Sequence, residues 1–248
     1  MNRAFVVVCF GDRRRQLLTL TKSIDVYVPR VPVHLYTDHP ELYEKDFDVI
    51  IHERKPKWYG HPRSAVRSSN QIKVQATTEL KDIHTFCLID DDMQIVSSAF
   101  SEGFELADKF GAVLPMNPRV YVKYLKQSAD VSPEILEELK LLSEYTTACN
   151  FSPFFYCREI TIASVFMRCL EQELLRGYRG TLAVWVAAYK SGYTPLYLPE
   201  QWCVCGDYAE HLRDYSIRLK GEIVPVSPIC LHLGHDKVRE VFDGYKMD

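Results

Sequence analysis

The sequence of 248 residues has neither a long hydrophobic run nor a strong excess of one charge. No stretch approaches the roughly 20 apolar residues that span a bilayer, and the apolar run near the N-terminus is too short for a secretory signal. The 30 Lys and Arg residues nearly balance the 33 Asp and Glu residues, which gives no support to broad nucleic-acid binding. We therefore expect a cytoplasmic protein with no transmembrane segment and no nucleic-acid partner.

The eight cysteines include no C-x-x-C pair, which argues against a zinc ribbon or a thioredoxin-like motif. Cys203 and Cys205 form a C-x-C, a weak metal signal, and we expect all eight to be reduced thiols. Repeats, low-complexity stretches and linkers are also absent. A single domain over residues 1–248 is the simplest prediction.

The first 90 residues alternate between strand and helix patterns. "FVVVCF" (5–10) is a short β-branched apolar run, typical of a strand buried on both faces. Leu17, Leu18 and Ile24 then repeat at helical spacing. This pattern predicts an α/β fold with a Rossmann-like, open, mostly parallel sheet flanked by helices. The further strands are expected at 31–38, 47–53 and 84–90, with a helix at 70–81.

The pattern changes after Asp92, and its elements are less regular. An extended segment is expected at 148–157, and the C-terminal stretch 226–237 reads as a short strand that enters a His-rich turn. We also expect a strand at 111–116 and helices at 131–145, 160–177 and 181–192.

Three adjacent carboxylates, Asp90, Asp91 and Asp92, follow the apolar residues "FCLI". Ligands of open α/β sheets bind outside the carboxyl ends of the strands. Side chains two positions apart on an extended chain point the same way, so Asp90 and Asp92 can share one cation while Asp91 points elsewhere. Carboxylates suit Mg²⁺ and Mn²⁺, and a bound diphosphate would supply further oxygens.

Three other interpretations of these carboxylates were weighed. An EF-hand loop needs Gly and Glu at fixed later positions, and the residues after Asp92 do not fit it. A D-x-D-x-T phosphatase would have Thr where Gln94 stands. A solvated turn after a strand stays open on the D-x-D alone.

The segment "NQIKVQATTELKDIHTFCLIDDDMQIV" (70–96) resembles the donor site of GT-A glycosyltransferases. It is most similar to the glycogenin-like and bacterial lipooligosaccharide galactosyltransferase families, which are retaining. The resemblance implies that Asp90 and Asp92 hold Mn²⁺ or Mg²⁺ on a nucleotide-diphosphate sugar. It also implies that Lys73 approaches the diphosphate or the sugar, the alternative being a solvated helix lysine. Asp91, which points away from the metal, is assigned to the sugar nucleotide, with a contact to backbone or solvent as the alternative.

The same resemblance places the end of the first strand, Phe10, Gly11 and Asp12, at the nucleotide. Gly11 allows close approach, and Asp12 could accept a hydrogen bond from base or ribose, or cap the following helix. Arg13–Arg15 is expected to be a mostly solvated helix start, from which one side chain could reach a phosphate.

"LHLGHDK" (231–237) is similar to a C-terminal His-x-x-Gly-x-x-Lys stretch of these families. Here the distance from His232 to Gly234 is one residue shorter, and so is the distance from His232 to Lys237. The resemblance implies that His232, or His235 as second choice, completes the metal site. It also implies that Lys237 touches the diphosphate.

The acceptor half carries a weaker likeness. Asn150 matches a family Asn that could bind donor sugar or acceptor, while Ser152 stands where Gly is usual. The helix near 181 resembles one that closes the acceptor site, but Gly180 and Thr181 stand where these families place an acid.

The missing acid bears on the mechanism, because an inverting transfer needs a general base to deprotonate the acceptor hydroxyl. Without an evident base we expect retention of configuration, with Glu200 and Asp207 as the other carboxylates that could serve.

The predicted function is therefore a metal-dependent glycosyltransferase that acts on a glycan, lipid-linked or protein acceptor, with residues 1–96 binding the nucleotide sugar and 97–248 the acceptor. A sugar-phosphate nucleotidyltransferase is the first alternative, although it needs a Gly-rich loop and "CFGDRRRQ" holds one Gly. A non-catalytic sugar-nucleotide or glycan-binding relative is the second.

Overall fold

The structure is a computed structural model of the chain. It describes residues 2–58, 63–121, 137, 147–205, 216–219, 222–225 and 227–234.

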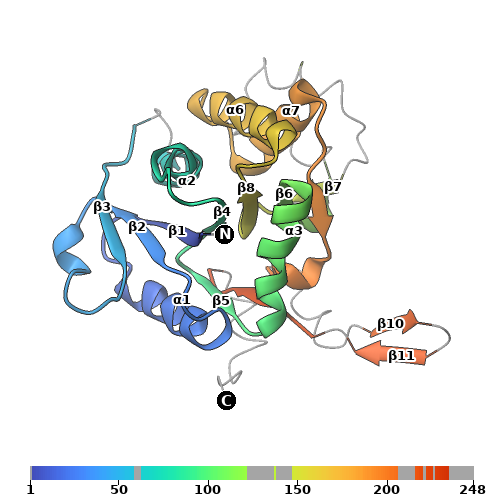
Figure 1. Cartoon of the computed structure of the whole chain (residues 1–248), viewed down its shortest axis with the longest axis horizontal. Coiled ribbons are helices and arrows are strands. Elements are labelled where there is room, and N and C mark those ends of the chain that lie inside the picture. Colours follow the sequence, from blue (N-terminus) through green and yellow to red (C-terminus); the bar gives the residue numbers. More distant parts are fainter. Residues whose placement is uncertain are drawn as a thin grey trace.

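A mixed sheet of eight strands runs through the centre of the described part of the molecule (Figure 1). Its order is β3-β2-β1-β4-β8-β6-β7, with β9 beside β6. The strands are β1 (Arg3–Cys9), β2 (Val33–Thr37), β3 (Ile50–Glu53), β4 (Thr85–Ile89), β6 (Ala112–Tyr121), β7 (Thr147–Cys149), β8 (Phe154–Cys157) and β9 (Leu196–Leu198).

The first four strands in the chain are all parallel, whereas β8 pairs antiparallel with both β4 and β6. The chain runs outward from β1 to β2 and β3, then returns to place β4 on the other side of β1. A reversal of this kind opens a crevice at the carboxyl ends of the two strands, where ligands of such sheets bind. The crevice therefore lies between the residues that follow Cys9 and those that follow Ile89.

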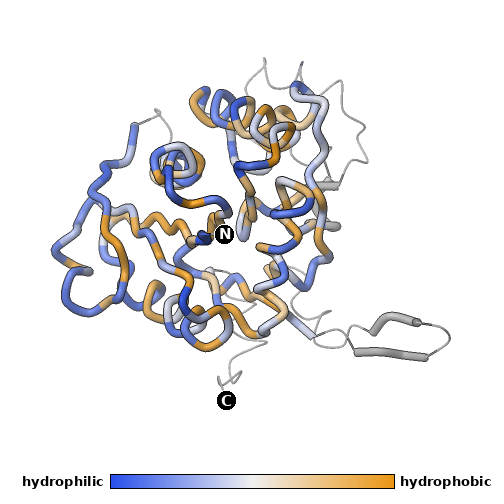
Figure 2. The backbone as a smooth tube through the Cα atoms, in the orientation of Figure 1, coloured by the Kyte–Doolittle hydropathy of each residue, from blue (hydrophilic) through white to orange (hydrophobic). Residues whose placement is uncertain are grey.

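Helices cover both faces of the sheet (Figure 1). One face carries α1 (Arg14–Tyr27) and α3 (Glu102–Phe110), and the other carries α2 (Ser64–Glu79), α6 (Thr161–Leu175) and α7 (Gly180–Ser191). Strand β1 shows why two layers form, since Phe5 and Val7 join the core under α1 while Val6 and Val8 join the core under α2. The central strands accordingly include long apolar stretches of the backbone tube (Figure 2).

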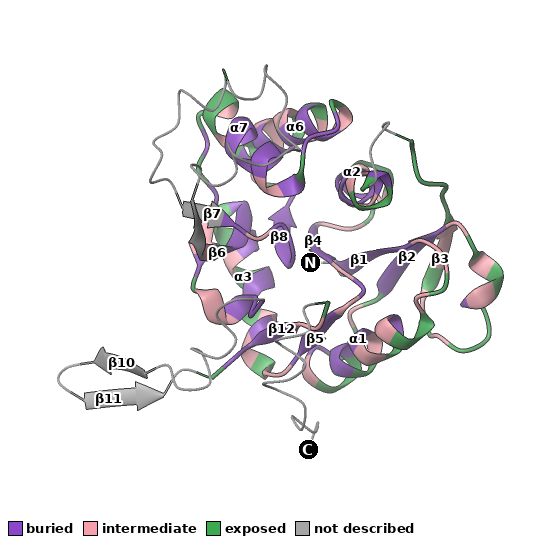
Figure 3. Ribbon diagram, turned by 180° about the vertical axis from the view of Figure 1, so that it is seen from behind, coloured by how far each residue is buried: buried purple, intermediate pink, exposed green. Residues whose placement is uncertain are grey.

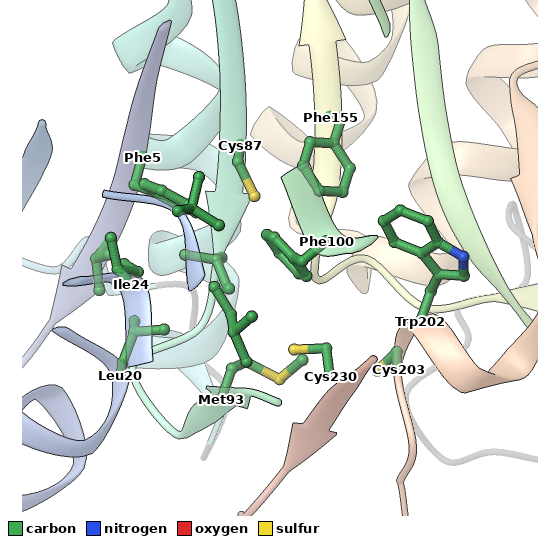
Figure 4. Packing of buried hydrophobic residues seen from close by; sticks show 14 of the residues in the cluster. Phe5, Leu20, Ile24, Cys87, Met93, Phe100, Phe155, Trp202, Cys203 and Cys230 are labelled. Carbon is green, nitrogen blue, oxygen red and sulfur yellow. The ribbon is translucent and has the colours of Figure 1, made fainter. Parts of the chain in front are cut away.

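Aromatic side chains fill the core on the α1–α3 face (Figure 4). The Phe155 ring lies 5.1 Å from that of Phe100 and 5.3 Å from that of Phe104, and Trp202 packs edge-on at 6.0 Å. A Cβ atom at Gly103 would lie 2.3 Å from Phe155 Cζ, so only glycine allows α3 to approach this closely.

A second, two-stranded sheet brings the end of the described chain back to the crevice. Strand β5 (Met93–Ile95) pairs antiparallel with β12 (Cys230–His232) in the register His232 opposite Met93 (Figure 3). Another antiparallel pair, β10 (Ser216–Leu219) with β11 (Glu222–Pro225), extends away from the sheet (Figure 1). The 3₁₀ turns are η1 (Pro40–Leu42), η2 (Ser98–Ser101) and η3 (Glu200–Trp202).

The structure confirms the predicted α/β class and the mostly parallel sheet, but not every element. Helix α2 starts six residues before the predicted 70–81, and α3 and the β10–β11 hairpin were not predicted. The predicted helix 131–145 lies outside the described residues apart from Glu137, which is helical. Within the described ranges, no helix combines the length and the apolar character needed to cross a membrane.

Candidate active site

A cleft of about 650 Å³ opens at the carboxyl ends of β1 and β4. One end is charged and contains Arg13, the three aspartates and His232. The other end is rich in amides and reaches the first residues of α7. The residues that line the cleft include Phe10, Arg13, Asn70, Asp90, Asp91, Asp92, Asn117, Asn150, Phe151, Ser152, Arg179, Gly180, Thr181, Cys205 and His232.

Asp90, Asp92 and His232 converge at the charged end. One ligand atom from each lies within 4.8 Å of the others, and no other cluster of this kind occurs among the described residues. The aspartates belong to the short link between β4 and β5, while His232 arrives through the β5–β12 pairing. The backbone N–H of Leu233 donates to the Asp92 carbonyl at 2.8 Å and secures this junction.

These three residues fit a divalent cation. The Asp92 Oδ1 atom is buried, accepts no hydrogen bond from the described residues, and lies 3.2 Å from His232 Nε2. A Cβ atom at Gly234 would lie 2.3 Å from Asp92 Oδ2 and 3.2 Å from His232 Nε2, so the glycine leaves the space beside both ligands open. Two carboxylates and an imidazole are a donor set that Mn²⁺ and Mg²⁺ sites in proteins can use.

The opposite charges in this cluster change the pKa values of His232 and Asp92. Burial alone would lower the pKa of His232, but contact with Asp92 and Cys205 and the charge of the carboxylates raise it to about 10. Burial alone would raise the pKa of Asp92, yet contact with His232 and the charge of Arg13 hold it below its ordinary value. Without a cation, the histidine therefore carries the positive charge that the carboxylates attract.

Two cationic side chains also face the aspartates. Lys73 is fully buried and its ammonium contacts Asp90 Oδ1, which rules out the alternative of a solvated helix lysine. Arg13 donates from Nε and Nη2 to the Asp91 carboxylate at 2.7 and 3.2 Å, and its Nη2 lies 3.6 Å from Asp92 Oδ2. Arg13 is thus a cleft residue, unlike the mostly solvated helix start that the sequence suggested.

Asp91 is not one of the residues of the metal cluster, and its partner is an arginine. Its side chain is buried against Arg13. Burial raises the pKa of Asp91 above its ordinary value, although the Arg13 guanidinium opposes the shift. The assignment of Asp91 to the sugar nucleotide stays a prediction.

The turn after β1 is held by hydrogen bonds within the fold. Gly11 has a φ of +70°, its N–H donates to Asp38 Oδ1 at 2.8 Å, and its carbonyl accepts from the Tyr43 hydroxyl. Asp12 is exposed, and its hydrogen bonds with the side chain and the backbone N–H of Arg14 lower its pKa to about 2. Phe10 lines the cleft, whereas Gly11 and Asp12 are not among its lining residues. Their contact with a nucleotide stays a prediction.

At the amide end, Asn150 Oδ1 accepts from Asn117 Nδ2 at 3.2 Å and from the Cys205 thiol at 3.8 Å. Ser152, which stands where relatives have Gly, accepts at Oγ from the Asp90 backbone N–H at 2.8 Å. These contacts tie the amide end to the metal cluster.

The N-terminus of α7 closes the amide end. A Cβ atom at Gly180 would lie 2.7 Å from Asn70 Nδ2 and 2.9 Å from the Phe151 ring. Among the described lining residues, only Asp90, Asp91 and Asp92 carry carboxylates.

Several predicted residues lie elsewhere. Glu200, in η3, is not among the lining residues of the cleft, and Asp207, His235 and Lys237 lie outside the described residues.

The sequence did not identify Asn70, Asn117, Cys205 or Arg179 as cleft residues. Only Asn70 had a signal, because it lies three residues before Lys73 on one helix and therefore shares its face.

No protein-family model matches the sequence, and no curated protein matches it. Solved structures do match its fold. The galactosyltransferase LgtC, in complex with donor and acceptor sugar analogs, is 10% identical and superposes with a TM-score of 0.58 over 92% of this chain and 86% of that one. Mouse xyloside xylosyltransferase 1 in its apo form is 13% identical, with a TM-score of 0.55 over 94% of this chain and 97% of that one. The chain therefore has the GT-A glycosyltransferase fold, which confirms the predicted resemblance at the level of the fold.

Proposed function

We propose that the protein is a metal-dependent glycosyltransferase that moves a hexose from a nucleotide-diphosphate sugar, expected to be a UDP-sugar, to a glycan, lipid-linked or protein acceptor. The observation that carries this proposal is the convergence of Asp90, Asp92 and His232 in a cleft at the reversal of strand order. Solved structures that share the fold include a galactosyltransferase with donor and acceptor sugar analogs and a xyloside xylosyltransferase, which supports this proposal. Residues 1–96 would supply most of the donor site, and 97–248 the acceptor site.

The charge distribution of the cleft suits a diphosphate. Asp90, Asp92 and His232 would hold Mn²⁺ or Mg²⁺, which when bound neutralises charge that develops on the leaving diphosphate. Lys73 and Arg13 already balance two of the three aspartates, so a bound cation meets a site with little excess negative charge. A site of this kind can accept an anionic ligand without strong repulsion.

The contents of the cleft support transfer with retention. The bond from the anomeric carbon to the diphosphate oxygen breaks, and the acceptor oxygen forms a new bond on the same face. The acceptor proton then passes to a diphosphate oxygen, so no protein base is needed. No carboxylate of the described residues lines the amide end, and Gly180 and Thr181 start α7 there.

Asn150 is the residue we propose at the reacting sugar. Its Oδ1 atom accepts hydrogen bonds from Asn117 and Cys205, which fix the position of the side chain in the lining of the cleft, and a group oriented in this way can contact a sugar. Phe10 also lines the cleft, and we propose that the base and ribose lie beside it.

Release of free nucleotide diphosphate tests this function directly. The purified chain would be incubated with a panel of UDP- and GDP-sugars and Mn²⁺, with and without EDTA. We expect metal-dependent release of UDP from at least one sugar nucleotide, even without acceptor, because water can take the acceptor's place. Release of pyrophosphate from a nucleoside triphosphate and a sugar phosphate would instead indicate the nucleotidyltransferase. Binding without any release would indicate a non-catalytic relative.

A further inference from the structure

Asn70 lies in the wall of the cleft, and its side chain has no hydrogen-bonding partner among the residues that the structure describes. Only 9% of the residue is exposed. Asn70 lines the cleft, so a ligand can reach its side chain. An amide that is held in a cleft wall without a partner from the described residues keeps its donors and acceptor for a ligand or for water.

The position of Asn70 places it between the metal cluster and α7. On helix α2 it precedes Lys73 by three residues, and side chains at this spacing share one helix face. Lys73 contacts Asp90 in the metal cluster. In the other direction, Asn70 Nδ2 would be only 2.7 Å from a Cβ atom at Gly180. The amide therefore belongs to the amide end of the cleft, one helical turn from the lysine that contacts the metal cluster.

The start of α7 offers further donors at the same place. Its first backbone N–H groups have no acceptor within the helix, because this is true of the first turn of every α-helix. The side chain of the N-cap residue, Arg179, makes no capping hydrogen bond, and no acidic residue lies in the first turn. Gly180 and Thr181 both line the cleft, so these N–H groups and the Asn70 amide lie at one wall.

Gly180 is what allows this arrangement. Any larger residue would place its Cβ atom against Asn70 Nδ2 and the Phe151 ring, at 2.7 and 2.9 Å. The structure thus explains why no acid stands at Gly180, because the Asn70 amide on α2 occupies the space that a side chain at this position of α7 would need.

We propose that Asn70, with the N-terminus of α7, forms a subsite that hydrogen-bonds an oxygen of the transferred sugar and so determines which sugar is accepted. This inference rests on the proposed function, because it assumes a nucleotide-diphosphate sugar in the cleft. It assigns the recognition of the sugar to a neutral side chain on α2, and it gives Asn70 no contact with the nucleotide.

The test compares binding of UDP with binding of UDP-glucose, UDP-galactose and UDP-xylose by calorimetry in Mn²⁺. We expect Asn70→Ala to raise the Kd of at least one UDP-sugar about tenfold, which is the size of the effect of one lost hydrogen bond. The Kd of UDP should change less than about twofold. Gly180→Ala should give the same selective loss, because its new methyl group displaces the amide. Gln75→Ala is the matched control, since Gln75 lies on α2 but lines a separate groove.

The outcomes separate the subsite from the proposed function. A purely structural role for Asn70 would lower the Tm of the variant and weaken UDP and UDP-sugars equally, and that result overturns the subsite. Unchanged UDP-sugar binding in both variants overturns it as well. Failure of the wild-type chain to bind UDP with Mn²⁺ contradicts the proposed function itself, and the subsite with it.

Discussion

The two ends of the cleft are built from different chemistry. At the charged end, Lys73 and Arg13 neutralise Asp90 and Asp91, and His232 contacts Asp92. At the amide end, Asn70, Asn117 and Asn150 provide neutral groups beside the start of α7. Buried ion pairs hold their geometry only while both partners are present, whereas neutral amides can exchange one partner for another at small cost. The charged end is therefore suited to a cation and a diphosphate, and the amide end to sugar hydroxyls.

Removal of a metal ligand should have the largest effect and should affect catalysis at the charged end alone. We expect Asp92→Asn to lower the turnover of UDP release by about 10²- to 10³-fold, the usual size for loss of one electrostatic group that acts in the transition state. The Tm should change little, because Asn keeps the shape of the side chain. Asp82→Asn, an exposed site outside the cleft, is the control, and undiminished turnover in Asp92→Asn would refute the site.

Loss of Arg13 should affect stability next most strongly. Arg13→Gln leaves the buried Asp91 carboxylate without its guanidinium, which we expect to lower the free energy of unfolding by about 1–3 kcal/mol. Urea denaturation measures the change. Arg14→Gln is a matched control, because its partner Asp12 is fully exposed and the loss of that pair should be negligible. Equal destabilisation by both substitutions would show that Arg13 is an ordinary surface arginine.

A change at the amide end should be smaller and should spare the metal. We expect Asn150→Ala to lower kcat/KM for the sugar nucleotide about tenfold, because one oriented hydrogen bond is lost. Titration with Mn²⁺ in the same variant should give an unchanged Kd. If the Mn²⁺ affinity falls as far as the catalytic efficiency, the two ends are not separate in function.

The smallest effect concerns acid pH and belongs to neither end. His34 Nδ1 on β2 lies 3.0 Å from His52 Nε2 on β3. Burial and the neighbouring imidazole lower the pKa of His34 to about 4. The unfolded chain binds this proton more readily, so the contribution is fully present above about pH 6.5 and is lost as the pH falls toward 4. His34→Gln should make the Tm less sensitive to pH over this window, by a few degrees. An unchanged pH profile of the Tm would remove His34 as the cause.

The elements around the charged end were largely predictable from sequence. Strands buried on both faces, such as β1 and β4, are continuous apolar runs, and an aspartate pair at the end of one is a local signal. Even so, the position of His232 in three dimensions depends on the β5–β12 pairing, which no local pattern encodes. The resemblance to a known family supplied that residue.

Three other features, of which only one belongs to the amide end, were predicted less well, for physical reasons. Helix α3 has Gly103 in its first turn, which lowers its helical propensity, but the close contact with Phe155 requires that glycine. Strand β6 continues to Tyr121, beyond the predicted 111–116, and so carries Asn117 into the cleft. Arg13 was misjudged because a charged residue at a helix start is usually solvated, and its partner Asp91 is 78 residues away.

Binding of Mn²⁺ to the wild-type chain and to His232→Ala tests the central claim most directly. Calorimetry should find one Mn²⁺ per wild-type chain, bound more tightly in the presence of UDP, because Asp90, Asp92 and His232 would hold the metal and the diphosphate would supply further oxygens. His232→Ala should weaken Mn²⁺ binding by about 10- to 100-fold, while His84→Ala, an exposed histidine paired with Glu159, should not. Equal Mn²⁺ affinity in His232→Ala, or UDP binding that is unchanged by EDTA, would contradict the proposal that Asp90, Asp92 and His232 form one metal site.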